Sequence, residues 1–259
     1  MKIDFHTHGK LAKRLPFAPE YTRLMLCQAR EAGLDALCLT EHFNTLDFEP
    51  LYRYFIENFP REGDCFLCGE LRVFSGMEID ISEGGHILVI GPVEEILLLN
   101  EKLAQYQKME QFLPFAELLD LAGGTFLLGA AHPLRAGSNI SSLPEELLLR
   151  LDFIDLNGKD CAEHANMKER VEAFAKKLDL PVVAGSDTHQ FFQYGCVSNR
   201  FFEPCATVAE LRRAIKSRAY TIEIAETAAY QVRTAGVLKR ALKQIDALGG
   251  DYLRVLAGR

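Results

Sequence analysis

Two pairs of side chains suited to metal binding stand near opposite ends of the sequence. His6 and His8 follow directly on Lys2–Phe5, and Asp187 and His189 follow an apolar run. Residues two apart on an extended backbone project from the same face, so the members of each pair point together. We therefore expect the two pairs to meet around metal.

More candidate ligands stand beside other predicted strand ends. They are Glu41, His42, Glu78, His86 and His132. A mixture of imidazole and carboxylate suits Zn, Mn or Fe, whereas a Ca site would consist almost entirely of oxygen ligands. His164 lies among charged residues near a predicted helix start, which favours an ordinary surface role.

Short apolar runs of strand type alternate with longer segments of helical period. The predicted strands are Ile3–His8, Ala36–Glu41, Val73–Ile79, His86–Ile90, Phe126–His132, Phe153–Asn157 and Pro181–Ser186. The predicted helices include Tyr21–Ala32, Leu113–Ala122, Glu163–Leu178, one that begins at Pro144 and one with a capping box at Thr207. This alternation predicts an α/β fold with parallel strands and helical crossovers, in a closed barrel or an open sheet.

The position of the candidate ligands favours the barrel. Nearly all of them follow the carboxyl ends of strands, where a parallel barrel has its active site, while an open sheet would use mainly the loops at its switch point. His86 is the exception, because it opens its strand. We expect Ser82–Gly85 to fold back sharply and bring His86 in, which glycine permits.

The sequence pattern changes from Thr221 onward. Glu226–Ala247 has helical period, Gly249–Gly250 interrupts it, and Tyr252–Ala257 follows. We therefore expect residues 1–220 to form the barrel and residues 221–259 to form a helical cap on the same domain.

Length and charge narrow the class of protein. The chain has 259 residues, which is enough for one large core, and a formal net charge of −7. The acidic balance argues against a nucleic-acid-binding surface but allows a small phosphorylated substrate, because a metal site supplies local positive charge. We expect no long nucleic acid as partner, and no membrane, since no apolar run approaches the roughly 20 residues of a membrane-spanning helix.

The cysteines favour a reducing compartment. There are seven of them, an odd number, and the first residues turn polar at once without an apolar leader, so we expect a cytoplasmic protein. Cys65 and Cys68 form a single CxxC without a second pair. We interpret them as two reduced cysteines in a loop and not as a structural zinc site.

Six short motifs together resemble the PHP family, which is named for polymerase and histidinol phosphatase. They are HTH at 6–8, LTEH at 39–42, GMEI at 76–79, GHILVIG at 85–91, AHP at 131–133 and GSDTH at 185–189. They occur in the family's order and cover the chain from its start to about residue 190. The resemblance implies a distorted seven-stranded (β/α) barrel that binds two or three divalent ions and hydrolyses phosphate esters.

The resemblance also implies a set of metal ligands. Those of a first ion are His6, His8, Glu78 and Asp187. Glu78 would bridge to a second ion, which His86 and His132 would also hold. A third ion would be held by His42 and His189 together with one more residue shortly after HTH.

The sequence departs from the family pattern at this third site. Lys13–Arg14 stand where the remaining ligand is expected, and Glu41 replaces the family's aspartate. Three alternatives remain. The third ion is absent, or Glu41, Glu20 or Asp47 supplies an oxygen, or a lysine or arginine head replaces the ion, since a guanidinium can bind phosphate through two donors.

The implied mechanism is attack on phosphorus by a metal-activated water, whose pKa falls from near 16 toward roughly 7. The catalytic candidates are Glu78, Asp187 and His189, and His189, His42 or a water would protonate the leaving group. The substrate-binding candidates are Arg14, Lys159, Arg200 and, as first choice for a phosphate clamp, Arg135. Asp4 shares a face with His6 and is expected to hydrogen-bond a ligand histidine.

Two other functions fit parts of this pattern. An amidohydrolase-like enzyme acting on C–N bonds also uses HxH on its first strand and Asp on its last, but GHILVIG is not part of its pattern. A non-catalytic metal-binding module with a degraded third site is the second alternative. The order of the six motifs favours the phosphoesterase.

Overall fold

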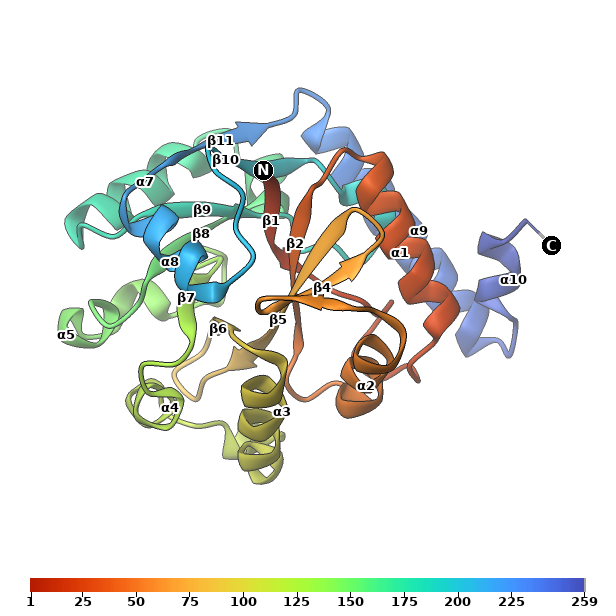
Figure 1. Ribbon diagram of the computed structural model, residues 1–259, viewed down its shortest axis with the longest axis horizontal. Coiled ribbons are helices and arrows are strands. Elements are labelled where there is room, and N and C mark those ends of the chain that lie inside the picture. The colour runs from red at the N-terminus through yellow and green to blue at the C-terminus, as the bar shows by residue number, and fades with distance from the viewer. Residues whose placement is uncertain (259) are drawn as a thin grey trace.

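Seven strands follow one another around a barrel-shaped sheet in the computed structural model, which describes residues 1–258 (Figure 1). They are β1 (Lys2–Thr7), β2 (Ala36–His42), β5 (Leu71–Asp80), β6 (His86–Ile90), β7 (Leu127–Ala131), β8 (Phe153–Asn157) and β9 (Val182–Gly185). These are the seven strands predicted from the apolar runs, and the predicted fold class is confirmed.

The two outer strands of this set, β1 and β9, meet and nearly close the barrel. The backbone N–H of Asp187 donates to the oxygen of His6 at 2.7 Å, and the N–H of His8 donates to Thr188 at 2.9 Å. Thr7 and Thr188 form an isolated parallel bridge. The two ligand pairs predicted from opposite ends of the chain therefore become neighbours.

The strand β6 runs against both of its neighbours. It pairs antiparallel with β5 and with β7, whereas the other neighbouring pairs within the set of seven are parallel. The prediction of uniformly parallel strands is therefore wrong at this one position. The reversal explains His86: the start of an antiparallel strand lies at the same end of the barrel as the carboxyl ends of its neighbours.

The hairpin between β5 and β6 turns as tightly as the glycines predicted. The backbone N–H of Ile81 donates to the oxygen of Gly85, and Gly84 and Gly85 have φ of 91° and 126°. Residues with a side chain rarely adopt these angles, so glycine makes the sharp return possible.

Four further strands lie outside the predicted set. β3 (Arg61–Glu62) and β4 (Cys65–Cys68) form a hairpin beside β5, while β10 (Val197–Phe201) and β11 (Tyr220–Ile224) extend the sheet beyond β1. Cys65 and Cys68 therefore lie in a strand and not in a loop, as the sequence interpretation had them. Both are free thiols, as are the other five cysteines.

Helices surround the sheet on the outside (Figure 1). They are α1 (Pro19–Glu31), α2 (Phe48–Asn58), α3 (Val93–Lys102), α4 (Phe115–Ala122), α5 (Glu145–Leu148), α6 (Gly158–Glu163), α7 (Met167–Lys177), α8 (Val208–Lys216), α9 (Ala228–Ala247) and α10 (Tyr252–Leu256). The capping box predicted at Thr207 is confirmed, since its side chain and that of Glu210 each accept from the other's backbone N–H. Helix α9 packs against α6 and the short 3-10 helix η4 (Phe191–Gln193).

Apolar side chains fill the barrel below the predicted ligands. The rings of Phe5 and Phe153 lie 5.8 Å apart across the interior, in one buried cluster with Phe74, Leu88 and Val183. The register of β1 against β2 shifts between Asp4 and Thr7, as at a β-bulge. The bulge lets Phe5 pack into this core while His6 reaches the polar end above it.

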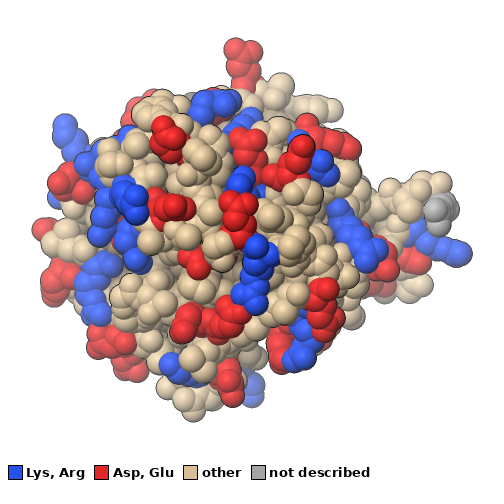
Figure 2. All heavy atoms as spheres, viewed as in Figure 1, with Lys and Arg blue, Asp and Glu red and all other residues tan. Residues whose placement is uncertain are grey.

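The face shown in Figure 2 mixes basic and acidic side chains over all the elements it presents, without a large area of one sign. Among residues 1–258, no helix is long and apolar enough to cross a membrane.

Candidate metal centre

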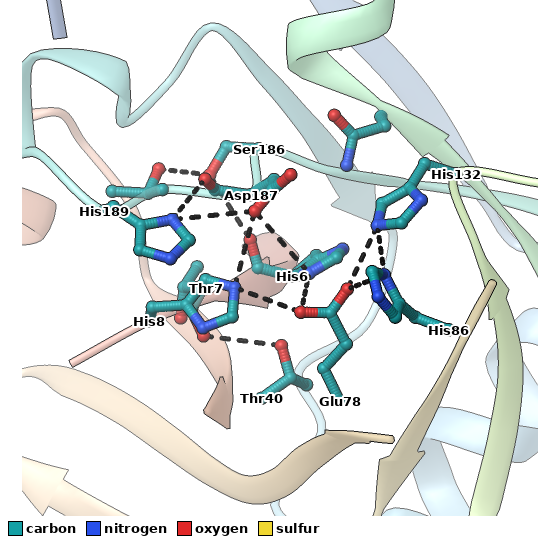
Figure 3. Close-up of polar contacts among 12 residues, drawn as sticks. His6, Thr7, His8, Thr40, Glu78, His86, His132, Ser186, Asp187 and His189 are labelled. Carbon is teal, nitrogen blue, oxygen red and sulfur yellow. Dashed lines mark hydrogen bonds and ion pairs between the residues drawn. The ribbon is translucent and has the colours of Figure 1, made fainter. Parts of the chain in front are cut away.

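The eight metal ligands proposed from the sequence gather at one end of the barrel (Figure 3). Nitrogen and oxygen atoms of seven of them form three overlapping groups, each with atoms within 4.8 Å of one another, and His86 contacts one of these groups through Glu78. The groups are His6, His8 and Asp187; His6, Glu78 and His132; and His8, His42 and His189. The structure thus brings together residues from five strand ends and from the loops that follow them.

The first group has the spacing of a metal coordination sphere. His8 Nε2 lies 3.6 Å from Glu78 Oε2 and 3.4 Å from Asp187 Oδ1, and His6 Nε2 lies 3.6 and 3.9 Å from the same two oxygens. Ligands bound at roughly 2.1 Å in a tetrahedron are separated by about 3.4 Å. The four atoms are therefore placed as ligands of one ion would be.

Glu78 connects this group to a second one through its other oxygen. Glu78 Oε1 lies 3.0 Å from His132 Nε2 and 3.0 Å from His86 Nδ1. Its Oε2 faces the pair His6 and His8 at 3.6 Å and also lies 2.8 Å from Nδ1 of His42. Figure 3 shows the carboxylate pointing between these two pairs of histidines. A carboxylate that divides its two oxygens in this way is suited to bridging two ions.

Several buried polar atoms in the cluster lack a hydrogen-bond partner within the described chain. They include Nε2 of His6, Nε2 of His8 and Nδ1 of His132. Nδ1 of His42 and Oε2 of Glu78 lie 2.8 Å apart, but not in hydrogen-bond geometry. Buried polar groups are normally satisfied, so a concentration of unsatisfied ones demands a ligand. A set of convergent imidazole nitrogens and carboxylate oxygens fits a divalent metal ion.

The pKa shifts in the cluster show that several of its histidine rings carry protons, which a metal ion would replace. Burial raises the pKa of Glu78, but the surrounding histidines, His42 first, bring it well below its usual range. Burial lowers the pKa of His86, but the Glu78 carboxylate outweighs this and raises it to about 10. The anionic carboxylates thus hold protons on nearby rings, which a metal would displace.

The third group consists of three imidazoles, and the residues considered as its oxygen donors lie elsewhere. Glu41 Oε1 faces His8 Nδ1 at 3.4 Å, on the side of the ring away from Glu78. Asp47 accepts from the backbone N–H of Phe17, and Glu20 is exposed at the start of α1. Lys13 forms an ion pair with Asp80, which contacts His86.

The backbone is strained where two of the ligands emerge. His132 and Asp187 have φ of 32° and 59°, in a region that residues other than glycine seldom adopt. Such angles cost of order 1–3 kcal/mol each and persist where function constrains the chain. The backbone at Gly185 also packs closely against β1, because a Cβ at this position would overlap His6 Cβ.

Asp155 orients one of the ligands and was missed by the sequence analysis. Its carboxylate lies 3.2 Å from His6 Nδ1 and accepts from the backbone N–H of His132. Its position within the apolar strand Phe153–Asn157 was the available signal, because a carboxylate there is buried. Asp4, which was expected to hydrogen-bond a ligand histidine, does so through the backbone N–H of His6 and also accepts from the backbone N–H of Ser186.

Arg135 lies at the edge of the cluster in a fixed position. Its guanidinium donates to Asp160 at 2.8 Å, to Asn157 at 2.8 Å and to Asp187 at 3.1 Å. Together with Lys159 it lines a cavity of about 700 Å³ above the ligands. One wall of this cavity is formed by α9.

The other two arginines proposed for substrate binding lie outside this cavity. Arg200 is exposed, forms an ion pair with Glu223 at 2.6 Å and stands opposite Lys2 at the start of β1, away from the ligands. Arg14 is exposed and does not contribute to the lining. The structure does not bring either of them to the centre.

Comparisons with known proteins agree with this architecture. Residues 164–220 match the family model described as PHP-associated. PsfC from Pseudomonas syringae PB-5123 has a similar structure, with a TM-score of 0.75 and 23% identity over 93% of this chain and 98% of PsfC. A sequence search of curated proteins finds no match.

A lesion-specific endonuclease also has this fold. PfuEndoQ from Pyrococcus furiosus gives a TM-score of 0.66 at 20% identity, over 85% of this chain and 57% of the endonuclease. Endonuclease Q bound to a 27-mer duplex with an abasic lesion at its active site gives 0.65 at 19% identity, over 83% of this chain and 56% of that one.

The second of these structures overturns one expectation. The sequence analysis excluded long nucleic acid from the net charge of −7, and this exclusion is wrong, since a protein of the same fold holds a DNA duplex at its active site. Net charge fails as a criterion because binding depends on local charge, and the cavity here is lined by Arg135, Lys159 and basic residues of α9. The match of residues 164–220 to the PHP-associated model agrees with the resemblance to the PHP family that the six motifs indicated.

Proposed function

We propose that this protein is a metal-dependent phosphoesterase that hydrolyses phosphate monoesters or diesters in the cavity above the ligand cluster. The observation that carries the proposal is the position of Glu78, whose Oε1 faces His86 and His132 while its Oε2 faces His6, His8 and His42. A pair of ions held by one bridging carboxylate is the arrangement that stabilises both the attacking and the leaving oxygen in phosphoryl transfer.

The ligand set supports at least two ions. His6, His8, Asp187 and Glu78 would hold one, and Glu78, His86 and His132 would hold another. The mixture of donors suits Zn, Mn or Fe. His42 and His189, with His8, offer a third position, where no carboxylate takes part in the group within residues 1–258.

When bound, such ions supply a water that ionises near neutral pH and positive charge for the phosphate oxygens. The chain itself supplies orientation. Asp155 fixes the His6 ring by accepting from Nδ1, so that Nε2 faces the cluster. Arg135 holds a guanidinium at the edge of the cavity, where it can bind a phosphate oxygen while it positions Asp187.

His189 is the proposed source of a proton for the leaving group, with His42 as the alternative. Its Nδ1 lies 3.2 Å from the backbone oxygen of Asp187 and therefore carries a proton, which leaves Nε2 without one. Burial and the neighbouring His8 hold the pKa of His189 well below its usual range. Nε2 would therefore first have to take up a proton from a water molecule before it could donate to the leaving group, and His189 could do this only if it does not hold a third ion.

A small phosphorylated molecule is the first substrate class to test, because the cavity is of the size that binds small molecules and α9 walls one side of it. A nucleic acid is the second candidate, and the shared fold with endonuclease Q favours it. The seven free cysteines support a reducing, cytoplasmic setting for either.

The test is hydrolysis of an aryl phosphate, an aryl phosphodiester and an aryl amide by protein loaded with Mn²⁺. We expect turnover of a phosphate ester, and we expect His8→Ala and Asp187→Ala to lose bound metal and activity together. His164→Ala is the control, since this exposed side chain lies outside the cluster. Turnover of the amide alone would favour an amidohydrolase-like enzyme, and bound metal without any turnover would favour a binding module.

A further inference from the structure

The cavity is also lined by charged residues that are not candidate metal ligands. Four basic side chains are among them: Lys159 of α6, and Arg233, Lys239 and Arg240 of α9. Neither the six motifs nor the proposed mechanism uses the three on α9. They come from a segment that was expected only to cap the barrel.

The three basic residues of α9 share one face of the helix with small side chains. The other α9 positions that line the cavity are Ala229, Val232, Ala235 and Gly236. Spacings of three and four residues place these positions on the same side as the basic residues. A Cβ on Gly236 would meet only the end of the Arg240 side chain within 4 Å, so this part of the wall is open.

These basic groups form no ion pair within the described chain, although Glu163 lines the same cavity. Within residues 1–258, none of the four has a carboxylate within 4.0 Å, whereas Arg135 is held by both Asp160 and Asp187. Exposed arginines elsewhere, such as Arg53 and Arg61, also have acidic partners. Several unpaired cations facing one cavity raise its affinity for anions.

Lys239 is the member of this set nearest the cluster in electrostatic terms. Its side chain is half-buried. The charge of Lys239 lowers the pKa of His189, and the carboxylates of Asp187 and Glu41 in turn raise the pKa of Lys239. Arg135 already occupies the edge of the cluster where a scissile phosphate would lie. The basic side chains of α9 and α6 therefore add positive charge to other parts of the cavity lining, beyond the position that Arg135 occupies.

We propose that Lys159, Arg233, Lys239 and Arg240 form an anion-binding subsite that takes a second phosphate group of the same substrate molecule. This inference rests on the proposed function and adds a substrate class: phosphate esters that carry another phosphate at a distance from the one removed. Arginine and lysine bind phosphate through charge-assisted hydrogen bonds, which are stronger than those between neutral groups. The cavity of about 700 Å³ has room for such a molecule.

The experiment compares two matched sugar esters with the metal-loaded enzyme. Fructose 1,6-bisphosphate and fructose 6-phosphate differ only by the second phosphate. We expect kcat/KM to be at least about tenfold higher for the bisphosphate, as one good charge-assisted contact would give, with most of the difference in KM. A 5′-phosphorylated dinucleotide is the second probe, in which a phosphodiester supplies the other anion.

Variants of the α9 residues then test whether they cause the preference for the bisphosphate. Lys239→Met and Arg233→Met should each reduce the ratio of the two kcat/KM values, and the double variant should bring it close to one. Lys243→Met is the matched control, because this exposed lysine lies on α9 outside the cavity lining. At pH 6.5, where Lys239 is charged with or without Lys243, this change should leave the ratio unchanged. Thermal unfolding of each variant checks that the fold is retained.

The outcomes separate the two proposals. If the wild-type enzyme hydrolyses phosphate esters but treats both sugars equally, the subsite is refuted and the phosphoesterase stands. A preference that survives in the double variant also refutes the subsite. If no phosphate ester is hydrolysed at all, the proposed function itself fails.

Discussion

The carboxylate of Asp155 and Nδ1 of His6 lie 3.2 Å apart, on the side of the ring opposite the cluster. Asp155 is fully buried, and His6 Nε2, across the ring, faces Glu78. This contact fixes both the tautomer and the orientation of a ligand histidine. In the proposed metal centre, Asp155 would thus support a ligand without itself binding the ion.

Replacing this carboxylate should weaken metal binding. We expect Asp155→Asn to lower metal affinity by about 10–100-fold, the range seen when residues that support metal ligands are changed. Calorimetric titration of metal into the stripped protein measures the change. Asp152→Asn is a suitable control, because Asp152 lies before the same strand and pairs with Arg212 away from the cluster. Equal affinity in Asp155→Asn and wild type would contradict the orienting role.

The close approach of β9 to β1 makes Gly185 sensitive to a single methyl group. A Cβ there would overlap His6 Cβ, so Gly185→Ala must displace the first strand or the last one. We expect a loss of about 1–3 kcal/mol in the free energy of unfolding, together with weaker metal binding. Gly124→Ala provides the comparison, since a Cβ at Gly124 meets nothing within 4 Å. Denaturant unfolding of both variants, with and without metal, measures the effect.

The anion subsite should depend on pH through Lys239. The pKa of Lys239 is lowered to about 8, mainly by burial and also by Lys243 and Lys159, while Asp187 and Glu41 act in the opposite direction. A lysine carries its charge below its pKa and loses it above. We therefore expect the preference for the bisphosphate to fall as pH rises through about 8.

Lys239→Arg tests this pH dependence directly. An arginine stays charged across this range, so the variant should keep its preference at pH 9 where the wild type has lost part of it. The measurement is the ratio of kcat/KM for the two fructose esters between pH 6.5 and 9.5. Identical profiles for the variant and the wild type would remove Lys239 from the subsite.

The capping role proposed for the C-terminal helix predicts a cost for disturbing its buried face. Leu242 on α9 is fully buried, whereas Val237 on the same helix is 55% exposed. We expect Leu242→Ala to lower the free energy of unfolding by about 2–5 kcal/mol and Val237→Ala to have little effect. Thermal and denaturant unfolding measure both. A similar, small effect of the two changes would mean that α9 is not an integral part of the domain.

Much of the fold could be predicted from the sequence because local signals and tertiary structure agree. Seven apolar runs became the seven strands of the barrel, and the Thr207 capping box begins α8 as expected. The direction of β6 was not predictable from its own residues, since apolar period does not distinguish parallel from antiparallel pairing. The glycines before His86 were the one local indication of the reversal.

The ligand cluster was predictable to a similar degree, and for a different reason. Its residues are histidines and carboxylates that follow strand ends, so residue type and position together identify them in the sequence. Asp155 was missed because a single acidic residue within a strand gives no periodic signal. The basic residues of α9 were missed because the same sequence fits a solvated helix face, and only the tertiary structure brings them to the cavity.

The meeting of β1 with β9 also has a consequence for biosynthesis. His6 and His8 leave the ribosome early, but their partner Asp187 follows only after most of the chain has been made. Contacts between such distant segments form slowly, because a long loop must close first. The nascent chain therefore exposes two strong imidazole donors for much of its synthesis, and the full metal centre can assemble only late, as one of the last events of folding.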